Sequence, residues 1–278
     1  MKIAVTGANG FLGRGIVKQL LDNNIEVVAI SRNIDGLDTR AELIQKNVFE
    51  MIDPYLEMKQ PNAVLHLAWI DGFNHNANSH VDNLADHFHF LEKVFSSPVD
   101  MVSVMGTAHE IGFFEGAVQS TTPTNPSNFY GIAKNSLRQL VEELASKNNK
   151  KYQWLRAFYI IDNDPSGQSI FSKIIQANDR GDKLFPFVDG KNQFDFLPYN
   201  VFSSYVAKTV SQLDITGIIN IASGYPQSIG SVMENFIETN KLDIRLDYGR
   251  FPTRKYDSKA IWGDSSKLNR IIHNSNIE

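Results

Sequence analysis

A glycine-rich turn close to the start of the chain constrains the fold more than any other feature of the sequence. An apolar run at residues 3–6 leads into Gly7-Ala8-Asn9-Gly10-Phe11-Leu12-Gly13, and an amphipathic stretch follows at residues 14–21. A strand that passes through G-x-x-G-x-x-G into a helix brings helix-terminal amides to a pyrophosphate, and its glycines permit close backbone approach. A plain strand-to-helix turn is the alternative. The position of the motif favours a dinucleotide site with these cofactor-binding residues: Gly7, Asn9, Gly10, Phe11, Leu12 and Gly13.

Apolar runs and helical patterns alternate through the first 160 residues. The runs at residues 27–31, 63–68, 99–104 and 153–160 lack strict polar alternation, as strands buried on both faces do. A helical pattern covers residues 129–147, and its expected inner face consists of Ile132, Ser136, Leu140 and Leu144. Strands separated by helices predict an α/β fold, a Rossmann-type doubly wound parallel sheet.

The pattern of expected strands and helices changes after Asp162, where residues 162–167 have the composition of a loop. Short helical and short strand-like segments then mix as far as the C-terminus. We predict a nucleotide-binding domain at residues 1–165, to which a later piece at about residues 190–222 returns. A small C-terminal α/β part at residues 166–278 is expected mainly to bind substrate.

Composition excludes several kinds of chemistry. The chain of 278 residues contains no cysteine, which rules out disulfides, thiolate nucleophiles and Cys-ligated zinc. A net charge of −4 and the absence of a long basic run argue against a nucleic-acid partner. The sequence has no stretch of 18 apolar residues and no signal-peptide pattern, so we expect no membrane association and a cytoplasmic location.

Histidines crowd one part of the sequence without a recognisable metal-binding pattern. No H-E-x-x-H motif occurs, and His87 and His89 would point to different sides of a helix. We therefore expect no metal site. Ordinary surface or pocket positions are predicted for the histidines of this region, which are His66, His75, His80, His87 and His89.

The end of the second expected strand indicates which dinucleotide is bound. An acidic residue at this position bonds the ribose 2′-hydroxyl of NAD, but this chain has Ser31 and Arg32 there. Arg32 can pair with a 2′-phosphate, and Ser31 can donate a hydrogen bond to it. These two residues favour NADP. NAD stays possible because Asp35 is close enough to reach the ribose if the loop curls back.

Tyr130 and Lys134 stand four residues apart near the start of the helix expected at residues 129–147, so they share a face. A lysine there can favour the phenolate, which lowers the tyrosine pKa, and can also bind the nicotinamide ribose. The tyrosine can exchange a proton with a carbonyl oxygen while a hydride moves to or from the carbon. We expect both residues to be catalytic and to bind the cofactor.

With these motifs, the chain resembles the extended short-chain dehydrogenase/reductase superfamily, in its branch of sugar-nucleotide epimerases, dehydratases and 4-keto reductases. Within that branch it resembles the dTDP-4-dehydrorhamnose reductases most. The similarity runs along nearly the whole chain. It is carried by T-G-A-N-G-F-L-G at residues 6–13, H-L-A at 66–68, Y-G-I-A-K at 130–134, N-I-A-S-G at 220–224 and D-S-S-K at 264–267.

The resemblance implies roles for further residues. Leu67 and Ala68 would line the cofactor, and Thr107 would be the hydroxyl that holds the substrate carbonyl. Ser103 is the rival hydroxyl, but Thr107 lies past the end of its strand, where open α/β sheets place their ligands. The residues expected to bind substrate are Trp69, Asn83, Thr107, His109 and Asp195.

Departures from the family pattern narrow the reaction. Ala108 and His109 stand where family dehydratases carry Asp-Glu, so the acid and base that eliminate water are missing. Trp69 replaces a frequent small residue and would narrow the pocket. Asp195 belongs to Gln193–Phe196, which retains only the D-F of the usual R-D-F. Contacts with the sugar nucleotide in the C-terminal part are therefore the least defined.

We predict an NADPH-dependent reductase of a nucleotide-activated 4-keto (6-deoxy) sugar, with Tyr130 as proton donor. The Ser31-Arg32 pair favours this reaction over the alternative, a nucleotide-sugar 4-epimerase that retains NAD. A non-catalytic NADP-binding regulatory protein on the same fold is a further alternative, against which the Tyr-Lys pair argues. The expected partner is a nucleotide sugar, and the resemblance adds a possible homodimer.

Overall fold

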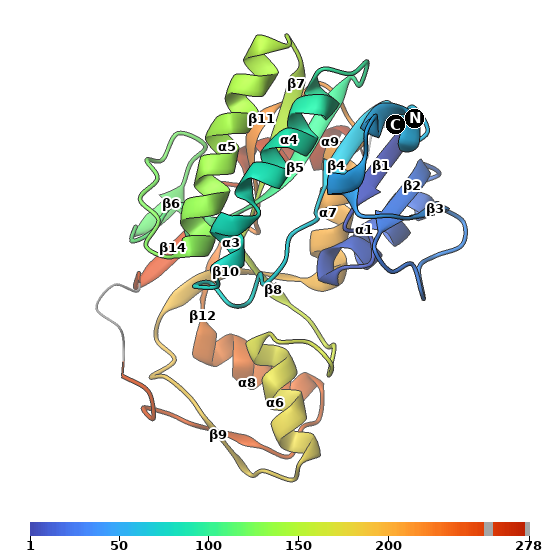
Figure 1. Ribbon diagram of the computed structural model, residues 1–278. Coiled ribbons are helices and arrows are strands. Elements are labelled where there is room, and N and C mark those ends of the chain that lie inside the picture. The colour runs from blue at the N-terminus through green and yellow to red at the C-terminus, as the bar shows by residue number, and fades with distance from the viewer. Residues whose placement is uncertain (253–257, 276–278) are drawn as a thin grey trace.

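A seven-stranded parallel sheet forms the centre of the larger part of the molecule in the computed structural model, which describes residues 1–252 and 258–275 (Figure 1). Its strand order is β11-β7-β5-β4-β1-β2-β3, and every neighbouring pair is parallel. The strands are β1 (Lys2–Thr6), β2 (Glu26–Ser31), β3 (Glu42–Gln45), β4 (Ala63–His66), β5 (Met101–Thr107), β7 (Lys151–Ala157) and β11 (Gly217–Ile221). The order reverses between β1 and β4, where a doubly wound sheet forms its ligand crevice.

Helices cover both faces of this sheet, as a parallel sheet requires. On one face lie α1 (Phe11–Asp22), α7 (Tyr199–Val210) and α9 (Ser266–Asn274), which share a core cluster with β1 and β7. On the other face lie α4 (Leu84–Phe95) and α5 (Phe129–Lys147), which pack on the opposite sides of the same strands. Short helical turns complete this part: η1 (Val48–Glu50), α2 (Pro54–Glu57), α3 (Ser79–Asp82) and η2 (Ala108–Glu110).

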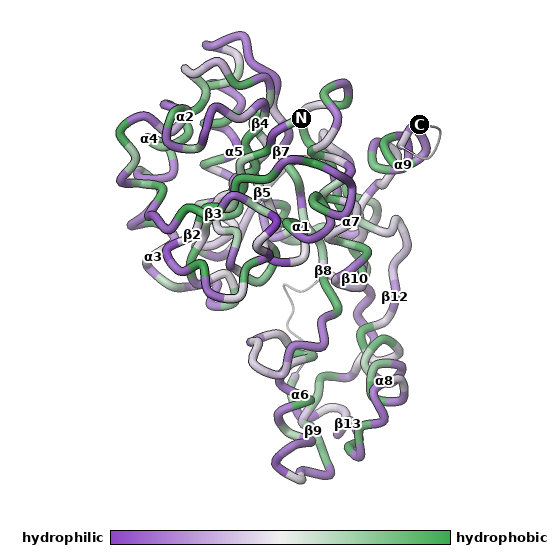
Figure 2. Tube along the Cα trace, turned by 90° about the vertical axis from the view of Figure 1, so that its right-hand side faces the viewer, coloured by the Kyte–Doolittle hydropathy of each residue, from purple (hydrophilic) through white to green (hydrophobic). Residues whose placement is uncertain are grey.

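The smaller part of the molecule is built on a second, mixed sheet. Its strands are β6 (Gly116–Val118), β8 (Tyr159–Ile161), β10 (Gln193–Pro198), β12 (Pro226–Ser228) and β14 (Ala260–Gly263). Two further strands, β9 (Leu184–Pro186) and β13 (Arg245–Asp247), pair with each other and pack with α6 (Ile170–Asp179) and α8 (Ile229–Thr239). Figures 1 and 2 show α6, α8 and β9 together at one end, away from the seven-stranded sheet.

The predicted α/β doubly wound fold with a smaller C-terminal part is confirmed. The chain returns to the first sheet with α7 and β11, whereas β10 belongs to the second sheet, which also takes β6 from the first half of the chain. The boundaries at residues 165 and 166 stay a prediction. Among residues 1–252 and 258–275, no helix is long and apolar enough to cross a lipid bilayer.

Two local expectations need correction. The edge strand β3 was not predicted, because its sequence Glu-Leu-Ile-Gln is half polar and no residue in it is fully buried. The inner face of α5 was wrong in part: Leu144 is buried as expected, but Ile132 is 43% exposed, and Lys134, Leu137 and Val141 are buried. The true stripe follows spacings of three and four residues, and it includes a charged side chain that hydrophobic periodicity cannot detect.

Candidate active site

The glycine turn between β1 and α1 is shaped for close contact with a ligand. Gly7 has a φ of +68°, and a Cβ atom there would lie 2.7 Å from the backbone nitrogen of Ala68. A Cβ on Gly13 would lie 2.4 Å from the carbonyl oxygen of Gly7. The helix begins after Gly10 without any side-chain cap, so its first amides remain available to an anion. These features fit the pyrophosphate of a dinucleotide.

Asn9 connects the glycine turn to the loop that follows β2. Its amide nitrogen donates to the carbonyl oxygens of Asn33 (2.9 Å) and Asp35 (3.2 Å), and its Oδ1 accepts from Nε of Arg14 (2.7 Å). Ser31, the last residue of β2, is half-buried, and Arg32, the first residue of the loop, is exposed. The predicted cofactor-binding residues Asn9, Ser31 and Arg32 therefore lie on two segments that the Asn9 side chain connects.

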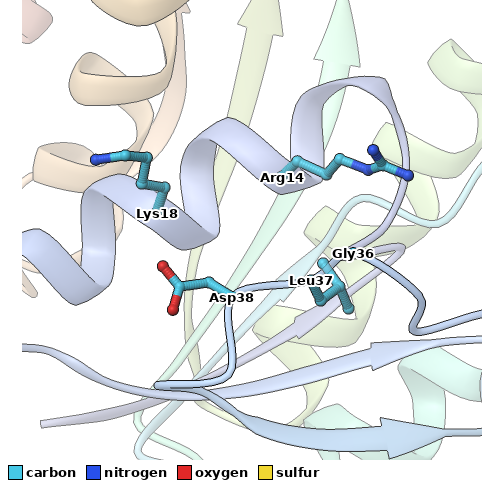
Figure 3. A pocket seen from close by; sticks show the side chains of 5 residues that line it. All are labelled: Arg14, Lys18, Gly36, Leu37 and Asp38. Carbon is cyan, nitrogen blue, oxygen red and sulfur yellow. The ribbon is translucent and has the colours of Figure 1, made fainter.

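A recess of about 300 Å³ lies beside this link, between α1 and the loop after β2 (Figure 3). It is lined by Arg14, Lys18, Gly36, Leu37 and Asp38. Lys18 is paired with Asp22, and Asp38 is paired with Arg40, so most charges around the recess are compensated within the protein. Arg14 lies at the end of the recess nearest the start of α1.

Thr107 occupies the carboxyl end of β5 and begins η2. Its hydroxyl accepts a hydrogen bond from the backbone N–H of His109 (3.2 Å), and Glu110 accepts one from the backbone N–H of Thr107 (2.7 Å). The two bonds form a capping box that fixes the residue. Ser103 is different, because its hydroxyl donates to Gln153 inside the sheet (2.7 Å). The structure thus places Thr107, and not Ser103, at the ligand edge of the sheet.

Tyr130 stands in the first turn of α5, whose start is capped by Asn128 through a 2.8 Å bond to the amide of Gly131. Burial raises the pKa of Tyr130 to about 12, and a hydrogen bond with the Thr107 side chain opposes that effect. The phenol is therefore protonated at neutral pH. The pKa of Tyr130 is thus raised, contrary to the expectation that Lys134 lowers it. The side chains of Tyr130 and Thr107 are thus joined by a hydrogen bond at the carboxyl end of β5.

Lys134 lies one turn further along α5 and is buried. Its Nζ atom donates to the carbonyl oxygen of Met105 (2.8 Å) and lies 3.8 Å from the ring centroid of Trp69. Burial lowers the pKa of Lys134 to about 7, and the negative charge of Glu110 opposes the change. An ammonium with one protein hydrogen bond retains two donors for ribose hydroxyls.

Aromatic rings surround Tyr130 on several sides. The His75 ring is stacked on it at a centroid distance of 5.3 Å, and the rings of His109 and Trp69 meet it at steep angles at 5.9 and 6.2 Å. The backbone N–H of Tyr130 also donates to the carbonyl of His75 (2.9 Å). The segment after β4 therefore forms one wall of the site, and His75 occupies one of the two kinds of position expected for it, a pocket.

Comparison with known proteins decides the family. Residues 3–200 match the model of the NAD dependent epimerase/dehydratase family. A dTDP-6-deoxy-L-talose 4-dehydrogenase (NAD(+)) from Aggregatibacter actinomycetemcomitans is 38% identical over 269 residues, which is 95% of this chain and 99% of that protein. The chain belongs to the NAD-dependent epimerase/dehydratase family. It is accordingly an NAD(P)-dependent oxidoreductase of the sugar-nucleotide branch, as the motifs suggested.

More distant similarities in sequence and in fold also extend along nearly the whole chain. A GDP-6-deoxy-D-talose 4-dehydrogenase from the same organism is 22% identical and covers 99% of this chain and 92% of its own. The structure of a UDP-N-acetylglucosamine 4-epimerase from Methanobrevibacter ruminantium aligns with a TM-score of 0.83 at 20% identity, over 97% of this chain and 91% of that one. A UDP-glucose 4-epimerase from Thermotoga maritima aligns with a TM-score of 0.82 at 21% identity, over 97% and 92%.

Not every residue expected to bind substrate has a side chain that is free to contact a ligand at the candidate site. Asp195 is completely buried in β10, and its carboxylate accepts backbone N–H groups from Ser223, Gly224 and Gly263 (2.7, 2.9 and 3.2 Å). Because its oxygens join β10 to the segment after β11 and to the end of β14, we do not include Asp195 among the proposed substrate contacts. Asn83 lies between α3 and α4 and donates to the carbonyl of Ser79 (2.7 Å).

Glu110 is a site residue that the sequence reasoning missed. It is fully buried, and its carboxylate binds the indole N–H of Trp154 (2.8 Å) and the guanidinium of Arg156 (3.4 Å) besides the amide of Thr107. The signal was available, since Thr107-Ala108-His109-Glu110 has the T-x-x-E pattern of a capping box. The carboxyl end of β5 is thus anchored to β7 through one carboxylate.

Proposed function

We propose that this chain reduces the 4-keto group of a nucleotide-activated 6-deoxyhexose to a hydroxyl and can also catalyse the reverse oxidation. The observation that carries the proposal is the contact between Tyr130 and Thr107 at the end of β5, with Lys134 one helical turn away. The names of the two Aggregatibacter relatives, both 6-deoxytalose 4-dehydrogenases, support the same substrate class.

The side chains can perform the proton half of this reaction. Thr107 and Tyr130 both present hydroxyls to one point, where a ketone oxygen can accept hydrogen bonds from them. Tyr130, protonated because burial raises its pKa, donates its proton to that oxygen as the carbonyl becomes a hydroxyl. A nicotinamide cofactor, when bound, supplies the hydride to the carbon. Lys134 holds the ribose hydroxyls and keeps positive charge beside the phenol.

The substrate would lie against residues that the sequence already indicated. Trp69 and His109 both contact Tyr130 through their rings, and neither side chain is fully buried. We propose that they bound the sugar pocket together with Thr107. Leu67 and Ala68, which pack directly against Gly7, are proposed to line the cofactor. Asn83 is retained as a proposed contact at the start of α4.

We infer a preference for NADP(H) from the end of β2, where Ser31, Arg32 and Asn33 stand in place of a carboxylate. Ser31 and Arg32 offer a hydroxyl and a guanidinium instead, and Arg14 adds a second guanidinium through its bond to Asn9. The name of the 38% identical relative specifies NAD(+). Activity and affinity must therefore be measured with NADPH and NADH side by side.

A nucleotide-sugar 4-epimerase is the second candidate, because epimerases are among the structures with the same fold. The two functions differ in stoichiometry. A reductase consumes one reduced cofactor for each sugar converted, whereas an epimerase regenerates its cofactor in every cycle.

The test uses dTDP-, GDP- and UDP-linked 4-keto-6-deoxyhexoses with NADPH or NADH and follows loss of absorbance at 340 nm. We expect stoichiometric oxidation with at least one of them, and Tyr130→Phe to lower kcat by about 10²- to 10⁴-fold. Unchanged turnover in Tyr130→Phe contradicts the catalytic assignment. Interconversion of 4-epimers of a nucleotide hexose without net cofactor oxidation favours the epimerase.

A further inference from the structure

Lys134 carries a buried charge that lacks an anionic partner in direct contact. Among the described residues, no salt bridge includes its ammonium, and its polar contact is the carbonyl of Met105 (2.8 Å). A buried ammonium in such surroundings is strongly disfavoured unless other groups stabilise it. The remaining contact of the ammonium is the face of Trp69, 3.8 Å from the ring centroid.

The Trp69 ring is held firmly on its other sides. Its indole N–H donates to Nδ1 of His80 (3.0 Å), and Nε2 of His80 bonds the carbonyl oxygen of Asn74 (2.8 Å). These partners require His80 to be the neutral tautomer that carries its proton on Nε2. The His87 ring is stacked on Trp69 at 4.4 Å with 20° between the planes. The indole therefore has little freedom to turn away from the ammonium.

We propose that Trp69 is a positioning residue, which holds the Lys134 ammonium through its ring face and keeps it charged beside Tyr130. An aromatic face attracts a cation through its quadrupole, and the attraction is largest where water is excluded. In this role the ring substitutes for a carboxylate, and His80 orients the ring. The sequence suggests another role for Trp69, as a bulky residue that narrows the substrate pocket.

The other titratable groups near Lys134 do little to stabilise its charge, so this role falls to Trp69. His66 of β4 and His87 of α4 are neutral, because burial lowers their pKa values to about 3 and about 2. Tyr130 on the same helix is protonated. Glu110 of η2 favours the charged lysine, but its carboxylate is bound to Arg156. With the pKa of Lys134 at about 7, a small loss of stabilisation discharges it near neutral pH.

The experiment measures pH dependence in five variants: Trp69→Phe, Trp69→Leu, His80→Phe, Lys134→Met and Trp262→Leu. The readouts are the Kd of reduced cofactor and kcat/KM for ketone reduction between pH 5.5 and pH 9.5. Both should worsen as rising pH discharges Lys134. We expect the midpoint to fall by about one pH unit in Trp69→Leu and by less in Trp69→Phe, which retains a weaker aromatic face.

The other variants are controls. Lys134→Met should remove the titration, which assigns it to that residue. Trp262 is a partly buried tryptophan of the second sheet, and Trp262→Leu should leave the midpoint unchanged. His80→Phe removes the acceptor of the indole N–H, so its midpoint should move in the same direction as in Trp69→Leu. Thermal unfolding confirms that each variant is folded.

A role in packing or pocket shape predicts a different result. Trp69→Leu would then lower kcat/KM by the same factor at every pH, with the midpoint where it is in the unmodified protein, and this outcome overturns the inference. The inference rests on the proposed function only for the ketone used in the assay. Cofactor affinity is measured without sugar, so a failure to reduce any 4-keto sugar contradicts the proposed function while the test of Trp69 still stands.

Discussion

The backbone N–H of Thr107 donates to the Oε1 atom of Glu110 over 2.7 Å, so a fully buried carboxylate fixes the end of β5. The same carboxylate accepts the indole N–H of Trp154 and faces the guanidinium of Arg156, which is also completely buried. The proposed catalytic hydroxyl is therefore positioned by an interaction that also joins two neighbouring strands. Loss of this carboxylate should affect both stability and activity.

Glu110→Gln is expected to lower the free energy of unfolding by about 3 kcal/mol, because it leaves the buried charge of Arg156 unpaired. Urea denaturation measures the change. Glu142→Gln is the matched control, since Glu142 pairs with Arg138 where the carboxylate side chain is 34% exposed, and its loss should cost less than about 1 kcal/mol. Equal losses in the two variants would contradict the importance assigned to burial.

Thr107→Val removes the hydroxyl that contacts Tyr130 and retains the shape of the side chain. If this hydroxyl holds the ketone oxygen, kcat should fall by about 10²-fold or more, as when a donor to a developing oxyanion is lost. Thr107→Ser should preserve most of the activity. The control is Ser103→Ala. The hydroxyl of Ser103 donates to Gln153 inside the sheet, so its removal should not alter turnover. A comparable loss in Ser103→Ala would place the substrate elsewhere.

Local patterns were sufficient to predict the parts of the fold that depend on neighbouring residues. The glycine turn and the α5 helix are read correctly because turn chemistry, the Asn128 cap and periodicity act within a few residues. The inner face of α5 was misjudged because it includes Lys134, a charged residue that is buried at the candidate site and not in the hydrophobic core. The edge strand β3 was missed because its partner, and not its own apolar content, makes it a strand.

Contacts between distant segments could not be predicted in the same way. Asp195 carries a motif that suggests substrate, yet the amides that saturate it come from residues 28, 29 and 68 positions away. Likewise, nothing in the sequence shows that His80 accepts the indole N–H of Trp69, since this depends on how residues 70–79 curve back. The proximity of Tyr130 and Lys134 was predictable because both residues lie on one helix.

The proposed preference for NADP(H) predicts that two arginines bind the 2′-phosphate. Arg32→Gln and Arg14→Gln should each weaken NADPH binding by about tenfold, because each removes a charge-assisted hydrogen bond. Each should change the Kd of NADH by less than about twofold. Fluorescence titration of the reduced cofactors measures both. Lys18→Gln is the control, since Lys18 is occupied by Asp22. Tighter binding of NADH by the unmodified chain would show that the preference is for NAD.

Two buried histidines predict how stability depends on pH. Burial lowers the pKa of His66 to about 3 and that of His87 to about 2, whereas both imidazoles titrate near 6.5 in an unfolded chain. Between these values the unfolded state binds more protons, so the free energy of unfolding is highest above pH 6.5 and falls as the pH is lowered. Each histidine contributes a slope of up to about 1.4 kcal/mol per pH unit.

Between pH 6.5 and pH 5 carboxyl groups of ordinary pKa contribute little to the slope, and comparison of variants separates His87 from the other buried titratable groups. Urea denaturation at several pH values should show a smaller slope of the free energy of unfolding against pH in His87→Gln. The decrease should correspond to the uptake of about one proton fewer on unfolding. His89→Gln is the control, since His89 is on the same helix and its side chain is 66% exposed. A slope as steep in His87→Gln as in the unmodified chain would mean that folded His87 accepts a proton near pH 6.5. The bond between His66 and His87 (2.9 Å) would then be compatible with a charged imidazole.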